Sequence, residues 1–69
     1  MSKASSIINN LINGNLKDAQ EASKGFPAKL LTEEAQGMGY NYNEALLMTC
    51  YLKGIISFQD YCDSMNNKK

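Results

Sequence analysis

Apolar residues recur at spacings of three and four through most of this 69-residue chain, which is the period of amphipathic helices. Residues 41–53 are the densest stretch, and their apolar side chains would point around the whole circumference of a helix. Such a helix would expose apolar area to water unless other segments covered it, so we expect it to be the buried centre of the fold. Asn41 and Glu44 stand three apart and predict a capping box at its start, and Gly54 predicts its end.

Two weaker periodic segments precede the central one and predict two short helices. The first would begin at Ser2 or Ser5 and end at Gly14, and the second would cover residues 15–25 with Asn15 as its cap. Their apolar faces consist of Ala4, Ile7, Ile8, Leu11 and Ile12 in the first helix, and of Leu16, Ala19 and Ala22 in the second. Because alanine buries little area, we expect the second helix to be the least stable.

The segment 27–38 begins with Pro27, whose fixed φ suits the first turn of a helix. The buried face of that helix would consist of Leu30, Leu31, Ala35 and Met38. Thr32 stands before two glutamates and is also a good helix start. The segment is therefore either one helix from Pro27 or a turn followed by a helix from Thr32, and Gly37 and Gly39 end it in both cases.

The last helix has the most complete start signals in the chain. Ser57 and Asp60 are spaced as a variant of the capping box, and Ile56 and Tyr61 are spaced as a hydrophobic staple. The apolar side chains that we expect to face the central helix are those of Phe58, Tyr61, Cys62 and Met65. Residues 66–69 are expected to form a solvated tail.

No run of β-branched residues alternates with polar ones, so the sequence predicts no strand. We expect an all-α fold, with a single domain over residues 1–65 in which four to five short helices pack around the central buried helix at 41–53. A chain of this length buries only about 60 % of its unfolded surface, so its stability should be marginal. That shortage favours a partner subunit or a target that supplies further burial.

The charges weigh against nucleic acid and membrane as partners. Seven basic and seven acidic side chains balance to zero, and every basic one is lysine. Without arginine the chain has no bidentate fork for phosphate or guanine, and without net charge it has no long-range field to gather either polyanion. Asparagines interrupt the apolar N-terminal stretch, so we expect no membrane span and a cytoplasmic protein. Lysine without arginine, beside many asparagines and isoleucines, suits an A/T-rich coding sequence, as in some phages and mobile elements.

The side chains also argue against catalysis. The chain has no histidine, so a thiol nucleophile would lack its usual base. Cys50 and Cys62 lie on apolar faces, and we expect them to pack as small buried hydrophobes in a reduced protein. Glu33 and Glu34 are adjacent and would diverge by about 100° on a helix, so they are a poor catalytic pair. We therefore expect no enzyme, no cofactor and no metal site.

One stretch resembles a known class of DNA-binding protein. Ala35, Gly39 and Tyr40 fall where helix-turn-helix regulators have their small residue, turn glycine and following apolar residue, and Ala45 and Met48 match the inward residues of a recognition helix. The resemblance covers residues 32–53 and implies DNA binding. It departs from the class at the start of the would-be recognition helix, which carries an acidic residue and has its single lysine at the far end.

The remaining candidates for function are contact residues. Tyr40, Asn41, Tyr42 and Asn43 combine two side chains with large contact area and two with adaptable hydrogen bonds. The alternative is that Tyr40 packs inward and the asparagines cap a helix. Glu33 and Glu34 could dock a basic target, although the lysines interspersed among the acidic residues also suit a mixed solvated surface.

The sequence as a whole favours a small protein-binding module. We expect an accessory regulator or inhibitor that docks on a protein target through the tyrosine and asparagine corner, with self-association through surplus apolar surface as a further expectation. A DNA-binding regulator that uses residues 32–53 is the alternative.

Overall fold

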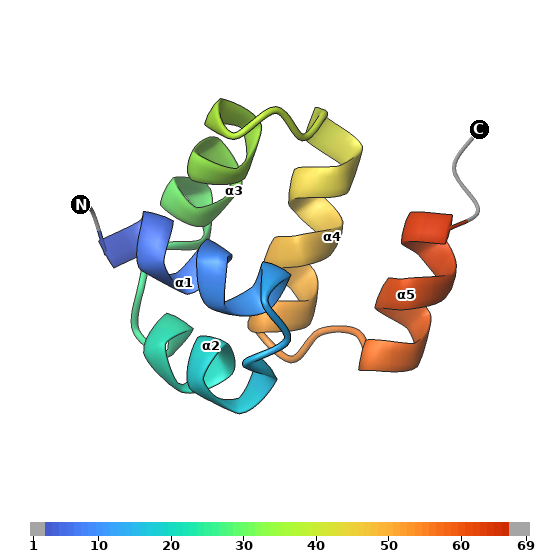
Figure 1. Cartoon of the computed structure of the whole chain (residues 1–69), viewed down its shortest axis with the longest axis horizontal. Coiled ribbons are helices and arrows are strands. Elements are labelled where there is room, and N and C mark those ends of the chain that lie inside the picture. Colours follow the sequence, from blue (N-terminus) through green and yellow to red (C-terminus); the bar gives the residue numbers. More distant parts are fainter. Residues whose placement is uncertain (1–2, 67–69) are drawn as a thin grey trace.

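Five α-helices make up the regular structure of residues 3–66, the part of the chain that the computed structural model describes (Figure 1). They are α1 (Lys3–Ile12), α2 (Leu16–Ser23), α3 (Ala28–Gly37), α4 (Tyr42–Leu52) and α5 (Phe58–Asn66). No strand occurs among the described residues, which confirms the all-α prediction.

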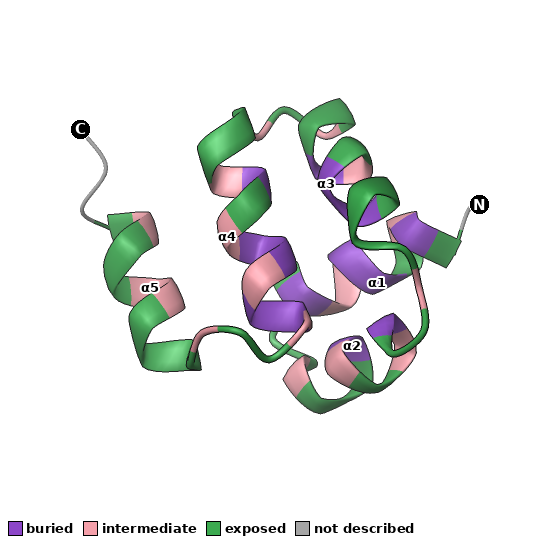
Figure 2. Ribbon diagram, turned by 180° about the vertical axis from the view of Figure 1, so that it is seen from behind, coloured by how far each residue is buried: buried purple, intermediate pink, exposed green. Residues whose placement is uncertain are grey.

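The five helices pack as one small domain. Helices α3 and α4 lie side by side, α1 crosses them on one face and contacts α2 and α3, and α2 reaches the end of α4 (Figure 1). The core between them is formed by Ile7, Ile8, Leu31 and Met48, whose side chains are almost completely buried. Figure 2 shows that the buried residues gather on α1, α3 and α4, whereas α5 stands to one side against α4.

Both predicted ends of α4 are confirmed. The side chain of Asn41 accepts a hydrogen bond from the backbone N–H of Glu44 at 2.8 Å, and the Glu44 carboxylate accepts one from the backbone N–H of Asn41 at 2.9 Å, which completes the capping box. At the other end Gly54 has a φ of 77°, and the N–H of Ile55 donates to the carbonyl of Cys50 at 2.9 Å. This Schellman ending requires the left-handed residue that glycine provides.

The expectation that α4 is covered on all sides is wrong. Helix α4 contacts α2, α3 and α5 and is central in that sense. However, Tyr42 and Leu46 remain 57 % and 37 % exposed. The four other short helices do not enclose the whole circumference of α4, so one strip of apolar side chains faces water.

Three predictions for the first helices need correction. Ser5 lies inside α1 and does not cap it, and Ser2 lies outside the described residues. Ile12 is 48 % exposed because it lies at the edge of the apolar face of α1, in the last turn. Asn15 does precede α2, but its side chain makes no capping hydrogen bond and instead donates to the Asn10 side chain at 3.4 Å.

The segment 27–38 forms one helix, α3, which begins directly after Pro27. A helix start at Thr32 is wrong, because Thr32 lies within α3 and its hydroxyl donates to the Ala28 carbonyl one turn earlier, at 3.2 Å. Leu31 is fully buried as expected, but its neighbour Leu30 is 46 % exposed. Consecutive residues point about 100° apart on a helix, so only one of the two leucines can face the core.

Helix α5 is attached through aromatic side chains. The Ser57 hydroxyl accepts a hydrogen bond from the Asp60 N–H at 3.1 Å, as its spacing predicts. The rings of Phe58 and Tyr61 each lie 5.4 Å from the ring of Tyr51 on α4, yet no residue of α5 is fully buried. Asn66 belongs to α5, so the expected tail begins at least one residue later, and positions 67–69 lie outside the described residues.

The attachment of α5 should weaken at high pH. Burial raises the pKa of Tyr61 above its usual value of 10.0, and the neighbouring Tyr40, Cys62 and Tyr51 raise it further. Because the unfolded chain loses this proton at a lower pH than the folded chain does, the stabilising contribution is complete below about pH 10 and is lost as the pH rises through the folded pKa. Titration of tyrosinate absorbance and of the free energy of unfolding, in the wild type and in Tyr61→Phe, tests this. A Tyr61→Phe variant with the same alkaline loss of stability as the wild type would contradict it.

Candidate functional site

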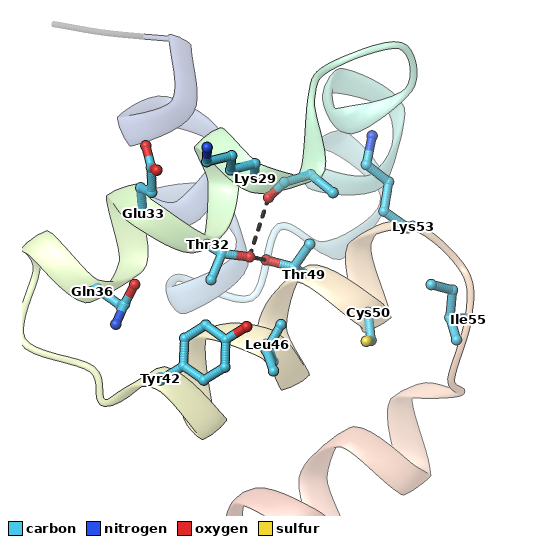
Figure 3. Close-up of a pocket in the computed structure, with 11 residues that line it drawn as sticks. Lys29, Thr32, Glu33, Gln36, Tyr42, Leu46, Thr49, Cys50, Lys53 and Ile55 are labelled. Carbon is cyan, nitrogen blue, oxygen red and sulfur yellow. Dashed lines mark hydrogen bonds between the residues drawn. The ribbon is translucent and has the colours of Figure 1, made fainter.

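An open groove of about 510 Å³ lies between α3 and α4 (Figure 3). Helix α3 contributes Ala28, Lys29, Thr32, Glu33 and Gln36. Helix α4 and the connection after it contribute Tyr42, Leu46, Thr49, Cys50, Lys53 and Ile55. The residues of α4 follow a spacing of three and four, so the groove runs along one face of that helix.

Three exposed apolar side chains, those of Tyr42, Leu46 and Ile55, form an apolar rim along the groove. Tyr42 and Leu46 stand one turn apart on α4, and Ile55, in the connection to α5, is 71 % exposed. These three are among the six large hydrophobic side chains that the described residues leave exposed. Apolar side chains gathered in one concave place, with polar groups around them, are typical of binding surfaces.

A pair of threonines forms the floor of the groove. The hydroxyls of Thr32 and Thr49 lie 2.9 Å apart and form a hydrogen bond in which either can be the donor. The other hydroxyl can then donate to a carbonyl of its own helix, that of Ala28 at 3.2 Å or that of Ala45 at 3.0 Å. Both side chains are buried, and every buried polar side-chain atom among the described residues has a hydrogen-bond partner. The floor therefore holds α3 against α4 without needing a ligand, and any binding must come from the apolar rim and its charges.

Two charged side chains line the groove on its α3 side, opposite the apolar rim. Lys29 and Glu33 are four residues apart on α3, and neither takes part in an ion pair within residues 3–66. Lys53 is different, because its ammonium group donates to the backbone carbonyls of Ser23, at 2.6 Å, and of Phe26. Its charge is thus used inside the domain, and Lys29 and Glu33 are the charged groups that a ligand would meet.

The four residues of the predicted tyrosine and asparagine corner do not act as one surface. Tyr40 is half-buried and packs against the core, which agrees with the packing alternative. Asn41 is used in the capping box, and Asn43 is exposed but does not line the groove. Of the four, only Tyr42 lines the groove, on its α4 side, with Glu33 on α3 across from it (Figure 3).

The two predicted glutamates are also separated. Glu33 stands on the ridge of α3, between the groove and a second hollow of about 370 Å³. Glu34 is half-buried and lines only that second hollow, beside Phe26 and Leu30. The pair therefore does not form a single acidic docking face.

Sequence reasoning missed Leu46, Ile55 and Lys29 as site residues. Leu46 was assigned to the core because its helix is apolar on all sides, and no local signal marks which side the fold leaves open. Ile55 follows the helix-ending Gly54, where an apolar residue commonly packs back onto the last turn of the helix, so its position in the sequence does not mark it as exposed. Nothing in the local sequence distinguishes Lys29 from the other lysines, and only its place beside the groove makes it a candidate site residue.

The cysteines are less buried than expected. Both Cys50 and Cys62 are free thiols of intermediate exposure, and Cys50 lines the groove. Within residues 3–66 no three histidine, cysteine or acidic side chains cluster in a way that would suit a metal ion. In the same part of the chain, no helix combines the length and apolar character needed to cross a bilayer.

Comparison of the chain with models of protein families, with curated proteins and with solved structures gave no match. The residues of the groove are therefore the basis on which a function can be inferred.

Proposed function

We propose that the protein is a binding module whose α3–α4 groove receives an amphipathic helix of a partner protein. The observation that supports this is the uncovered apolar rim formed by Tyr42, Leu46 and Ile55 around a groove of about 510 Å³. A helix laid in a hydrophobic groove is a recurrent mode of peptide recognition, and it uses apolar anchors spaced at three and four residues.

The rim sets requirements on the partner helix. Its apolar face would lie on α4 and on Ile55, and its polar flank would lie along α3. An acidic side chain opposite Lys29 and a basic one opposite Glu33 would complete the contact. Because these charges are exposed, we expect them to set orientation and selectivity, and we expect the apolar anchors to provide most of the affinity.

The accessible surface area of the domain is that expected of a compact monomer. Its accessible surface is 4291 Å², and a folded monomer of 7.6 kDa is expected to expose about 4,300 Å². The chain therefore exposes about as much surface as a compact monomer of its mass. A separate protein can bind and leave, as suits an accessory regulator or inhibitor that sequesters a helix of its target.

Capture of the target from the native host, with a groove variant and a matched surface variant, tests the proposal. Leu46→Lys places a charge in the groove, and Ile12→Lys makes the same kind of change on α1, away from both hollows. We expect wild type and Ile12→Lys to retain the same partner and Leu46→Lys to lose it, at least tenfold by direct titration of the purified partner. Circular dichroism should show that all three are folded.

Equal retention of a partner by wild type and Leu46→Lys would move the binding site away from the groove and contradict the proposal. The same capture, repeated with and without nuclease, distinguishes the DNA-binding alternative. That alternative is supported by the α3–turn–α4 arrangement, in which Ala35, Ala45 and Met48 are buried as the helix-turn-helix resemblance requires. It is opposed by Lys53, the lysine at the end of α4, whose ammonium binds backbone carbonyls of the domain itself.

A further inference from the structure

Helix α5 is attached to the domain differently from the other four helices. It packs against α4 and has no comparable contact with α1, α2 or α3 within residues 3–66, and Figure 1 shows it at one side of the domain. None of its residues is buried, and Tyr61 and Met65 pack only against the outside of the core. The buried apolar residues of the described chain all belong to α1–α4. The core is therefore assembled without α5.

Ring contacts hold α5 in place. The rings of Phe58 and Tyr61 each lie 5.4 Å from the ring of Tyr51 on α4, and Phe58 is itself 43 % exposed. In contrast, α2 and α3 are joined to α4 by buried hydrogen bonds. A helix that buries little apolar surface belongs to the part of a domain that opens at the lowest free-energy cost.

Helix α5 is also too short to persist without α4. It is 9 residues long, and isolated helices shorter than about 12–15 residues are marginal in water. The hydrogen bond from the Asp60 N–H to the Ser57 hydroxyl stabilises only its first turn. The connection before it adds little attachment, since Gly54, Ile55 and Ser57 are exposed. Loss of the ring contacts should therefore both detach and unfold α5.

We propose that α5 is an order–disorder switch, which detaches from α4 and unfolds as a unit while α1–α4 stay folded. Its opening uncovers Tyr51, which is 5 % exposed in the closed state and has both of its described ring partners on α5. On α4 Tyr51 follows Cys50, which lines the α3–α4 groove, and lies about 100° further round the helix. The open state thus extends the apolar surface of α4 beyond the groove. The switch is a property of this chain alone and does not rest on the proposed function.

Amide hydrogen exchange of the full-length wild type, measured by NMR at several low urea concentrations, tests the switch. Amides of α5 should exchange at least about a hundredfold faster than the most protected amides of α1, α3 and α4. Their rates should also depend less on urea, because opening α5 exposes less surface than unfolding the whole domain does. Equal rates and equal urea dependence in α5 and in the core would show that α5 opens only with the whole domain, which would overturn the proposal.

A double variant, Phe58→Ala with Tyr61→Ala, removes both rings that contact Tyr51. The resonances of residues 58–66 should then move to random-coil positions, whereas those of α1–α4 should keep their native dispersion. Loss of native resonances throughout the chain would mean that α1–α4 do not fold without α5, and native resonances throughout would mean that the rings do not hold it. Either result would contradict the switch.

Phe26→Ala is the matched control, because Phe26 packs against the core beside α1 and α3. It destabilises the closed and the open state alike. The exchange of α5 amides should therefore stay within about twofold of wild type, while the most protected core amides exchange about tenfold faster. Acceleration of α5 by the same factor as the core would show a single cooperative unit and would rule out the switch.

Discussion

Leu31→Ala should leave a large fraction of the molecules unfolded under conditions in which the wild type is folded. The Leu31 side chain is fully buried in the core between α1, α3 and α4. Truncation of a buried leucine to alanine costs about 2–5 kcal/mol, because transfer free energy is lost and a cavity remains. A domain of this length has a free energy of unfolding of only about 3–10 kcal/mol. The loss is therefore comparable with the whole stability.

The neighbouring leucine provides the control. Leu30 is on the same helix, one residue earlier, and is 46 % exposed. Leu30→Ala removes the same atoms from the sequence with the same change in helix propensity, but we expect it to cost less than about 1 kcal/mol. Thermal and urea denaturation of both variants should differ in midpoint by more than about 10 °C in the thermal case. Equal losses of stability in the two variants would contradict the orientation of α3 about its own axis, which buries Leu31 and exposes Leu30.

Features set by neighbouring residues were predictable from the sequence. The capping box at Asn41 and Glu44, the glycine ending at Gly54 and the hydrogen bond between Ser57 and Asp60 all join positions at most five apart. Their formation depends on backbone geometry that a short stretch of chain determines by itself. The all-α class follows from the same kind of information, because helical periodicity is local.

Features set by tertiary packing were not predictable. The run from Ala45 to Leu52 is apolar on all sides, so its pattern has no information about which strip stays open. Leu30 and Leu31 are adjacent and equally apolar, so the sequence does not show which of them faces the core. Thr32 illustrates the opposite error, because its local sequence resembles a helix start while its hydroxyl meets Thr49, 17 residues away. The groove exists only where such long-range pairings place α3 against α4.

The second large effect is expected at the joint between α2 and α4, where each helix satisfies the last carbonyls of the other. The Ser23 hydroxyl donates to the Leu52 carbonyl at 2.9 Å, and the Gln20 side chain donates to the Tyr51 carbonyl at 3.3 Å. In return the Lys53 ammonium donates to the Ser23 carbonyl. The Tyr51 and Ser23 carbonyls also accept from the N–H groups of Gly54 and Phe26, at 3.0 Å each, so the Leu52 carbonyl is the one that depends most on the cross-helix bond.

Lys53→Met keeps most of the apolar stem of the side chain and removes its charged donor. We expect a loss of about 1.5–3 kcal/mol, because hydrogen bonds to charged groups are stronger than neutral ones and the Phe26 carbonyl would lose its donor, whereas the Ser23 carbonyl would keep the Phe26 N–H at 3.0 Å. Ser23→Ala should cost about 1–3 kcal/mol for the orphaned Leu52 carbonyl. Both changes loosen the same joint, so the double variant should lose less than the sum of the two. Urea denaturation of the two single variants and the double variant measures all three losses.

Lys24→Met is the matched control for Lys53→Met. Lys24 has a side chain that is 75 % exposed, and its ion pair with Glu21 is long, at 3.9 Å. Removing its charge should change the free energy of unfolding by less than about 0.5 kcal/mol. If Lys24→Met and Lys53→Met were equally mild, the ammonium of Lys53 would be in water rather than on the α2 carbonyls. A second free cation would then stand beside the groove, in addition to Lys29, and a partner helix would need two acidic side chains rather than one to match it.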